Sequence, residues 1–201
     1  ILEEIDIAQL KKLSILIKPS NLKSFLNNKI KNGKIESEIE FFLNEKGKFK
    51  NFIAKGKVKN LKAELFKDLN LSKTNFNFFA DKNDVLIKNI FGNLGDIKIS
   101  EGDVKLNLEN GIKLNSNFSS LIDLDENLVG KYARFLGISK TLGKVDFFKA
   151  NLNNNIYFDL DSTYKIKDYE YSFSGKIEDI KLRLFKPIKN NLITEKLKNY
   201  P

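Results

Sequence analysis

Two aspartates, Asp159 and Asp161, have the spacing that comes closest to a catalytic arrangement. They alternate in the segment "IYFDLD", so on a strand both carboxylates would point to one face, as hydrolysis by paired carboxylates requires. The sequence has no histidine and no cysteine, which excludes Ser-His-Asp and Cys-His catalysis. It also lacks a glycine-rich phosphate loop. We therefore interpret the pair as the polar outer face of a strand, and we predict a protein that is not an enzyme and uses no cofactor.

A second acidic group lies in the segment "DLDEN". Asp123, Asp125 and Asn127 have the spacing of the first three ligands in a calcium-binding loop. Leu128 stands where such a loop needs glycine, and no glutamate closes the loop. The pattern therefore favours a solvated turn or helix cap over a metal site.

The rest of the chain alternates apolar and polar residues, which is typical of strands with one buried face. In "GKIESEIEFFL", for example, Ile35 and Ile39 share a face opposite to Glu36 and Glu38. Such segments recur about every ten residues, with Gly, Asn or Asp between them. This spacing predicts a mainly β fold, a long curved antiparallel meander shaped like a groove, with two or three short amphipathic helices.

The segment "DVKLNLENGIKLNSNF" at 103–118 predicts one hairpin in detail. A two-residue loop at Asn110-Gly111 would place apolar and charged side chains on the same face. A three-residue loop with Gly111 at positive φ instead places Leu106 opposite Leu114. We therefore expect one apolar face and one charged face, and the question is what covers the apolar one.

Two segments of similar sequence, "GKVKNLKAEL" at 56–65 and "GKIEDIKLRL" at 175–184, share a change of phase. Val58 is followed in phase by Leu61, and Ile177 by Ile180, so each segment has one extra residue. An extra residue of this kind predicts a β-bulge that bends the strand. Similar units repeated along the chain favour a sheet that extends by addition of hairpins.

Three short segments have helical periodicity. The first follows Asp6, the second spans 20–32 and ends at Gly33, and the third follows Asp125 and ends at Gly137. Their apolar stripes are Ile7, Leu10 and Leu13; Leu22, Phe25, Leu26 and Ile30; and Leu128, Val129, Tyr132, Phe135 and Leu136. We expect all three to dock on the sheet. The domains predicted are a helical lead-in over 1–32 and a β segment over 33–201, interrupted by a helix near 126–137.

The net charge of +9 could indicate a nucleic-acid or membrane-surface binder. The lysines are spread along the predicted strands, however, and Arg134 and Arg183 are the only arginines. Lys, Asn, Ile and Phe are all abundant, which AT-rich codons produce regardless of function. We therefore predict no binding to nucleic acid. Because the sequence starts at Ile1 and contains no methionine, we also expect a fragment of a larger protein.

The order of helix, glycine and strand meander resembles a known family. The passage "KPSNLKSFLNNKIKNGKIESEIEFFL" is similar to a recurrent passage of large AsmA-like proteins, in the YhdP branch beside TamB. Phe25 stands where that family usually has tryptophan, and Asp68-Leu69 replaces its usual Trp-Pro. The resemblance extends over roughly residues 5–140 and consists of hydrophobic and turn patterns.

The resemblance implies a repeating β-groove protein of the Gram-negative envelope, anchored in the inner membrane outside this fragment and extending through the periplasm. Such a protein would carry phospholipid acyl chains towards the outer membrane along an apolar groove, with envelope proteins as further partners. The alternative is a self-contained β-sandwich with a structural or adhesin-like role, whose two sheets cover each other. The predicted lining residues of the groove are Ile39, Phe41, Phe52, Phe76, Phe78, Ile97, Ile99, Leu106, Leu114, Ile156 and Phe158.

Overall fold

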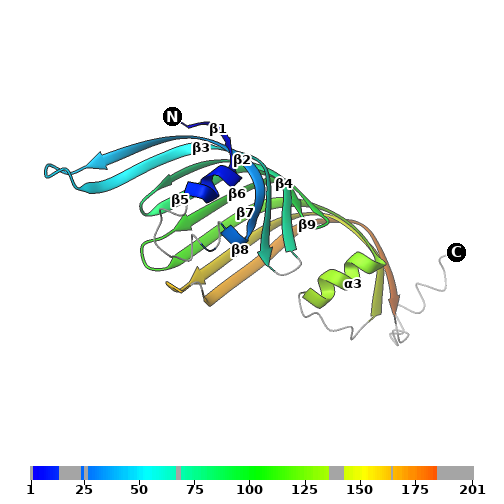
Figure 1. Ribbon diagram of the computed structural model, residues 1–201. Coiled ribbons are helices and arrows are strands. Elements are labelled where there is room, and N and C mark those ends of the chain that lie inside the picture. The colour runs from blue at the N-terminus through cyan, green and yellow to red at the C-terminus, as the bar shows by residue number, and fades with distance from the viewer. Residues whose placement is uncertain are drawn as a thin grey trace. The chain divides into compact units, whose positions relative to one another are not determined.

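A computed structural model describes residues 2–13, 24, 27–66, 69–135, 143–163 and 165–184 of this chain. The described strands form one open antiparallel sheet in which each strand pairs with the next along the sequence, from β1 to β9 (Figure 1). The mainly β meander is thus confirmed. Because these strands form one sheet, the alternative of two facing sheets is wrong for the described residues. The strands are β1 (Leu2–Asp6), β2 (Ile30–Leu43), β3 (Phe49–Phe66), β4 (Leu69–Asp81), β5 (Asp84–Leu94), β6 (Ile97–Asn107), β7 (Ile112–Asp125), β8 (Gly143–Leu160) and β9 (Ile166–Leu184).

The chain divides into two compact units. One unit comprises Ile1–Ile122 and Asn151–Lys176, and the other comprises Asp123–Ala150 and Ile177–Pro201. The candidate site described below lies in the first unit.

Two of the three expected helices are present, and both begin at the predicted residue. Helix α1 (Ile7–Leu13) directly follows Asp6, and helix α3 (Glu126–Phe135) directly follows Asp125. Asp125 Oδ1 accepts a hydrogen bond from the backbone N–H of Leu128 at 3.0 Å. This bond is the N-cap interaction that satisfies an otherwise unpaired amide of the first turn, so Asp125 acts as a cap.

The expected helical lead-in over 1–32 is wrong at both ends. Strand β1 precedes α1, and β2 already begins at Ile30, where Ile30 lies opposite Ala63 of β3. Gly33 is therefore a strand residue and not a helix cap, with φ of 148°. Residues from Ile30 onwards pair with β3 and do not continue the helix, because this pairing packs Ile30 against the core. Most of the predicted helix at 20–32, with Leu22, Phe25 and Leu26, lies outside the described residues.

The core of the first unit lies between α1 and strands β2–β4. Ile7, Val58, Leu61 and Ala63 are buried there, and the partly buried side chains that pack against them are Ile30, Ile35, Leu71, Phe76 and Phe78. A methyl group on Gly33 would lie 2.8 Å from Ile7 Cδ1 and 3.2 Å from Leu61 Cα. Glycine at this position thus lets α1 approach the sheet closely.

The hairpin at 103–118 has the predicted register, but its loop is longer than the predicted three residues, because β6 ends at Asn107 and Leu108 lies outside the strand. Leu106 lies opposite Leu114, and β6 and β7 are joined through a turn in which Gly111 has φ of 103°. The loop also lies against the neighbouring hairpin, since Leu108 N–H donates to Asn83 O at 2.7 Å. The alternating apolar side chains of both strands therefore point to one face of the sheet.

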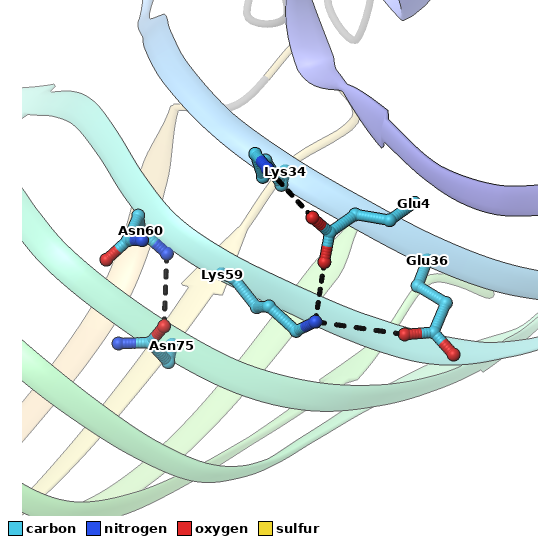
Figure 2. Close-up of polar contacts among 6 residues, drawn as sticks. All are labelled: Glu4, Lys34, Glu36, Lys59, Asn60 and Asn75. Carbon is cyan, nitrogen blue, oxygen red and sulfur yellow. Dashed lines mark hydrogen bonds and ion pairs between the residues drawn. The ribbon is translucent and has the colours of Figure 1, made fainter.

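The bulge predicted in β3 is also present. The pairing of β3 with β4 shifts between Val58 and Leu61, and Asn60 within this interval has φ of 51°. Its backbone N–H donates to Asn75 Oδ1 of β4 at 3.0 Å (Figure 2). A side chain of the adjacent strand therefore satisfies the amide that the bulge removes from the ladder. The corresponding bulge near Ile180 stays a prediction.

Candidate functional site

The pairing register places most of the predicted lining residues on a single sheet face. Residues directly opposite each other in an antiparallel pair point the same way, so a row of opposed residues marks one face. We call the face that carries this row the apolar face. One such row crosses six strands through Ile39, Ala54, Ala80, Val85, Leu106 and Leu114.

The other predicted residues join this face by alternation and pairing. Phe41 lies opposite Phe52, each two residues from a member of the row. Phe76 and Phe78 alternate with Ala80 and contact the core, and Ile97 and Ile99 lie opposite Leu94 and Gly92. Ile156 and Phe158 continue the alternation of β8, and the Phe158 ring lies 6.4 Å from that of Tyr169. The structure therefore brings all eleven side chains to one face.

Burial differs strongly along the apolar face. Val58 and Leu61 under α1 are 6% and 8% exposed, whereas Ile39 and Phe41 further along β2 are 38% and 68% exposed. Leu106 and Leu114 in the middle of the sheet are half-buried. Helix α1 packs over this face through Ile7, which contacts the cluster of Val58, Leu61 and Ala63. Several large apolar side chains are therefore open to solvent.

Sequence reasoning missed the aromatic stripe of β9, which consists of Tyr169, Tyr171 and Phe173. These side chains are 66%, 54% and 62% exposed, and the rings of Tyr171 and Phe173 lie 5.7 Å apart. Their strict alternation with Asp168, Glu170 and Ser172 was the signal that could have identified them. The stripe extends the apolar face to the last strand of the sheet.

A polar cluster interrupts the apolar face between β7 and β9. Asn154, which is buried, donates through Nδ2 to Ser120 Oγ at 2.9 Å and to Phe118 O at 3.2 Å. The Tyr171 hydroxyl donates to Asn154 Oδ1 at 3.0 Å. Partial burial of the phenol also raises the pKa of Tyr171. These bonds connect three strands and satisfy polar groups that would otherwise be costly to bury.

The opposite face carries most of the charge. Glu4 of β1 accepts from Lys34 of β2 and Lys59 of β3, and Glu36 lies 4.0 Å from the same Lys59 ammonium (Figure 2). Hydrogen bonds from the two lysines lower the pKa of the Glu4 carboxyl to about 2. In return, the bond to Glu4 raises the pKa of each lysine. These pairs connect three strands on the outside of the sheet.

The charged face is not free of large apolar groups. Phe79 and Phe91 point to it from β4 and β5, opposite Lys55 and Asn75 respectively, and both are about half exposed. A shallow open pocket of about 260 Å³ also lies on this side. It is lined by Glu101, Gly102, Asp103, Asn117, Phe118, Ser119, Asn153, Asn154 and Asn155.

The two aspartates considered for catalysis have different surroundings, and the buried Oδ1 of Asp159 has no hydrogen-bond partner among the described residues. Asp161 caps the turn between β8 and β9, where its Oδ1 accepts from Thr163 N–H and Lys165 N–H. The hydrogen bond from the Thr163 hydroxyl, together with these two backbone bonds, lowers the pKa of Asp161. In the described part of the chain, no group of three or more acidic residues converges to hold a metal ion.

The apolar face is thus the feature of the described molecule best suited to binding. None of the described helices is long and apolar enough to cross a membrane. No protein-family model, curated protein sequence or solved structure matches this chain.

Proposed function

We propose that this chain is a non-enzymatic segment of a bridge-like lipid transfer protein. In this proposal, phospholipid acyl chains lie along the apolar face and move between the inner and outer membranes of a Gram-negative envelope. The segment would work in the periplasm as part of a protein anchored in the inner membrane. The observation that carries the proposal is the open apolar face that runs across the strands of the sheet.

From β2 to β7 the apolar row consists of hydrocarbon side chains, and the polar cluster of Asn154 and Tyr171 lies beyond it. Each methylene group removed from water contributes roughly 0.8 kcal/mol, so an acyl chain can gain binding energy at every point of such a surface. Ala54, Ala80 and Val85 lie between the larger members of the row. An apolar surface of this kind allows a chain to shift along it, because no single contact defines one position.

Exposed apolar surface also needs an occupant. Contiguous apolar patches larger than a few hundred Å² are rare on soluble monomers and mark binding surfaces or aggregation sites. The open side chains here include Ile39 and Phe41 on β2 and Tyr169 on β9, near opposite edges of the sheet. Acyl chains would cover these groups and satisfy this requirement.

The test places a photo-crosslinking amino acid at Leu106 or at Lys105 in cells. These neighbours point to opposite faces of β6, so Lys105 is the matched control. We expect lipid adducts at position 106 and not at 105. Adducts at neither position in a folded protein would overturn the proposal.

A charge on the apolar face gives a functional test. An unpaired carboxylate costs several kcal/mol to place against acyl chains. The variant Leu106→Glu should therefore remain folded and reduce lipid transfer between vesicles, whereas Lys105→Glu should not. Native mass spectrometry of the purified protein, followed by lipid extraction, identifies the ligand.

A further inference from the structure

Strand β9 presents an unusual edge. It is the last strand in the sheet order, so no described strand pairs with its outer side. Over Ile166–Lys176 all its residues are exposed, including the aromatic stripe. An edge strand with open backbone groups and large apolar side chains is a template for pairing with another strand.

The other edge of the sheet lacks these properties. Strand β1 has five residues and carries Glu3 and Glu4, and Glu4 is held by lysines of β2 and β3. Short length and charge are devices that protect an edge from pairing. Strand β9 has 19 residues and no proline, and its part in the first unit is exposed along its whole length.

The sequence of the β9 edge is complementary to itself. If two copies pair antiparallel with Ser172 opposite Ser172, then Asp168 lies opposite Lys176 on the charged face, and this pair occurs twice. On the apolar face, Tyr171 lies opposite Phe173, again twice. Opposite charges and aromatic pairs at directly opposed positions both stabilise antiparallel strands.

The same register places Tyr169 opposite Gly175. Gly175 has no side chain, so a large ring from the opposite strand can cover its exposed backbone. Between Asp168 and Lys176 the opposed pairs in this register keep polar with polar and aromatic with aromatic or glycine, whereas Lys167 lies opposite Ile177 just beyond this range. A shift by one residue would place Tyr171 opposite a polar residue.

The hydrogen-bonding groups of β9 fit the same arrangement. The Tyr169 N–H donates to the side chain of Asp168 at 2.9 Å. This amide is therefore capped by its own neighbour, as expected for a group that points to the outer edge. Pairing would give it a carbonyl acceptor and free the Asp168 carboxylate for Lys176 of the second copy.

We propose that this edge is a docking surface for a second copy of the same chain, which pairs β9 with β9 about a two-fold axis at Ser172. The axis is perpendicular to the sheet, so the apolar faces of the two copies lie on the same side and join into one. The contact depends only on β9 and therefore does not rest on lipid binding. Because the matched contact spans Asp168–Lys176, only about nine residues of each copy, we expect a reversible, concentration-dependent dimer.

Disulfide formation between two copies can test this register. The sequence contains no cysteine, so a single introduced cysteine can pair only with its counterpart in the second copy. In the proposed register the Cα atoms of Ser172 in the two copies are about 4.5–5.5 Å apart, within the range that a disulfide can bridge. Ser174→Cys is the matched control, because two residues at position 174 would be offset by four residues, about 13 Å. We expect Ser172→Cys to form a disulfide dimer under mild oxidation and Ser174→Cys to form at least tenfold less.

Reversal of the charges at positions 168 and 176 tests the same register without a covalent bond between the copies. Asp168→Lys and Lys176→Asp should each weaken the dimer at least tenfold by sedimentation equilibrium, and the double variant should restore it. Lys48→Asp, in the turn between β2 and β3, is the control and should leave the dimer unchanged. Circular dichroism verifies that each variant is folded.

Two results would overturn the proposal. One is a folded protein that stays monomeric up to about 100 µM, well above the Kd expected for a specific contact. This result would mean that another strand, from this chain or from a different protein, covers β9. The other is a dimer that forms equally well with Ser174→Cys or with the single charge swaps, because its interface would lie elsewhere.

Discussion

The apolar face has two regions with similar residues and opposite burial. Under α1, Val58 and Leu61 are buried and form the core of the first unit. On β9, Tyr171 and Phe173 alternate in the same way but are exposed. Alternation thus selects the face of a strand, whereas burial depends on whether another layer lies on that face. The covered region provides stability, and the open region is available for binding.

The largest difference in stability between the covered and the open regions should appear when a leucine in each is replaced by alanine. Leu61→Ala removes a buried side chain and should lower the free energy of unfolding by about 2–5 kcal/mol. Leu43→Ala removes an open side chain near the end of β2 and should cost less than about 1 kcal/mol, because little buried area is lost. Urea titrations measure both values. Equal losses would show that α1 does not make this region the core.

Glycine substitutions test how closely α1 lies on the sheet. Gly33→Ala adds a methyl group 2.8 Å from Ile7 Cδ1 at φ of 148°, a conformation that is strained for alanine. We expect a loss of about 3 kcal/mol in the free energy of unfolding. Gly47→Ala, in an open turn with φ of 68° and no neighbour within 4 Å, should cost about 1 kcal/mol. Thermal melts of the two variants at one protein concentration provide the comparison.

The open region has a stabilising contact of its own, the hydrogen bond from Tyr171 to Asn154. Removal of the Tyr171 hydroxyl group tests it. Tyr171→Phe removes the donor to Asn154 Oδ1 and leaves this buried oxygen without that bond. The loss in the free energy of unfolding should be about 0.5–1.5 kcal/mol. Tyr169→Phe is the control on the same strand face and should change the free energy by less than about 0.3 kcal/mol. A larger effect from Tyr169→Phe would contradict the assignment.

The smallest expected effect on stability concerns the ion pairs of Glu4 with Lys34 and Lys59, which lie on the charged face of the sheet. The pKa of Glu4 is lowered to about 2 by Lys34 and Lys59, below its ordinary value of 4.5. A lowered native pKa means that the stabilisation is present above pH 4.5 and is lost as the pH falls towards 2. Titration followed by carboxyl NMR should yield this pKa, and Glu4→Gln should flatten the pH dependence of stability in this window. A Glu4 pKa near 4.5 would show that the lysines do not hold the carboxylate in solution.

The sequence predicted several local features correctly because their causes are local. The register of the hairpin at 103–118 follows from the alternation on both sides of Gly111. The cap of α3 follows from Asp125 just before a helical stripe, and the bulge at Asn60 follows from the change of phase after Val58. Each of these depends on a few residues close together in the sequence.

Gly33 illustrates what could not be predicted in this way. A glycine after an apolar stripe is typical of a helix end, but here β3 pairs with residues from Ile30 onwards. The polar cluster of Ser120, Asn154 and Tyr171 is another case, since its members lie on three strands far apart in the sequence. Such features depend on which strands become neighbours.

The sequence by itself determined which side chains share a face, because the side-chain period of a strand is two and the turns set the register. It also determined that no histidine or cysteine chemistry is available. Only the tertiary structure decided that Leu61 is buried while Phe173 is open, although both are large, in phase and on the same face. The physical reason is that burial depends on a second layer: Ile7 of α1 packs over Val58 and Leu61 of β3, whereas the described residues of β9 are exposed.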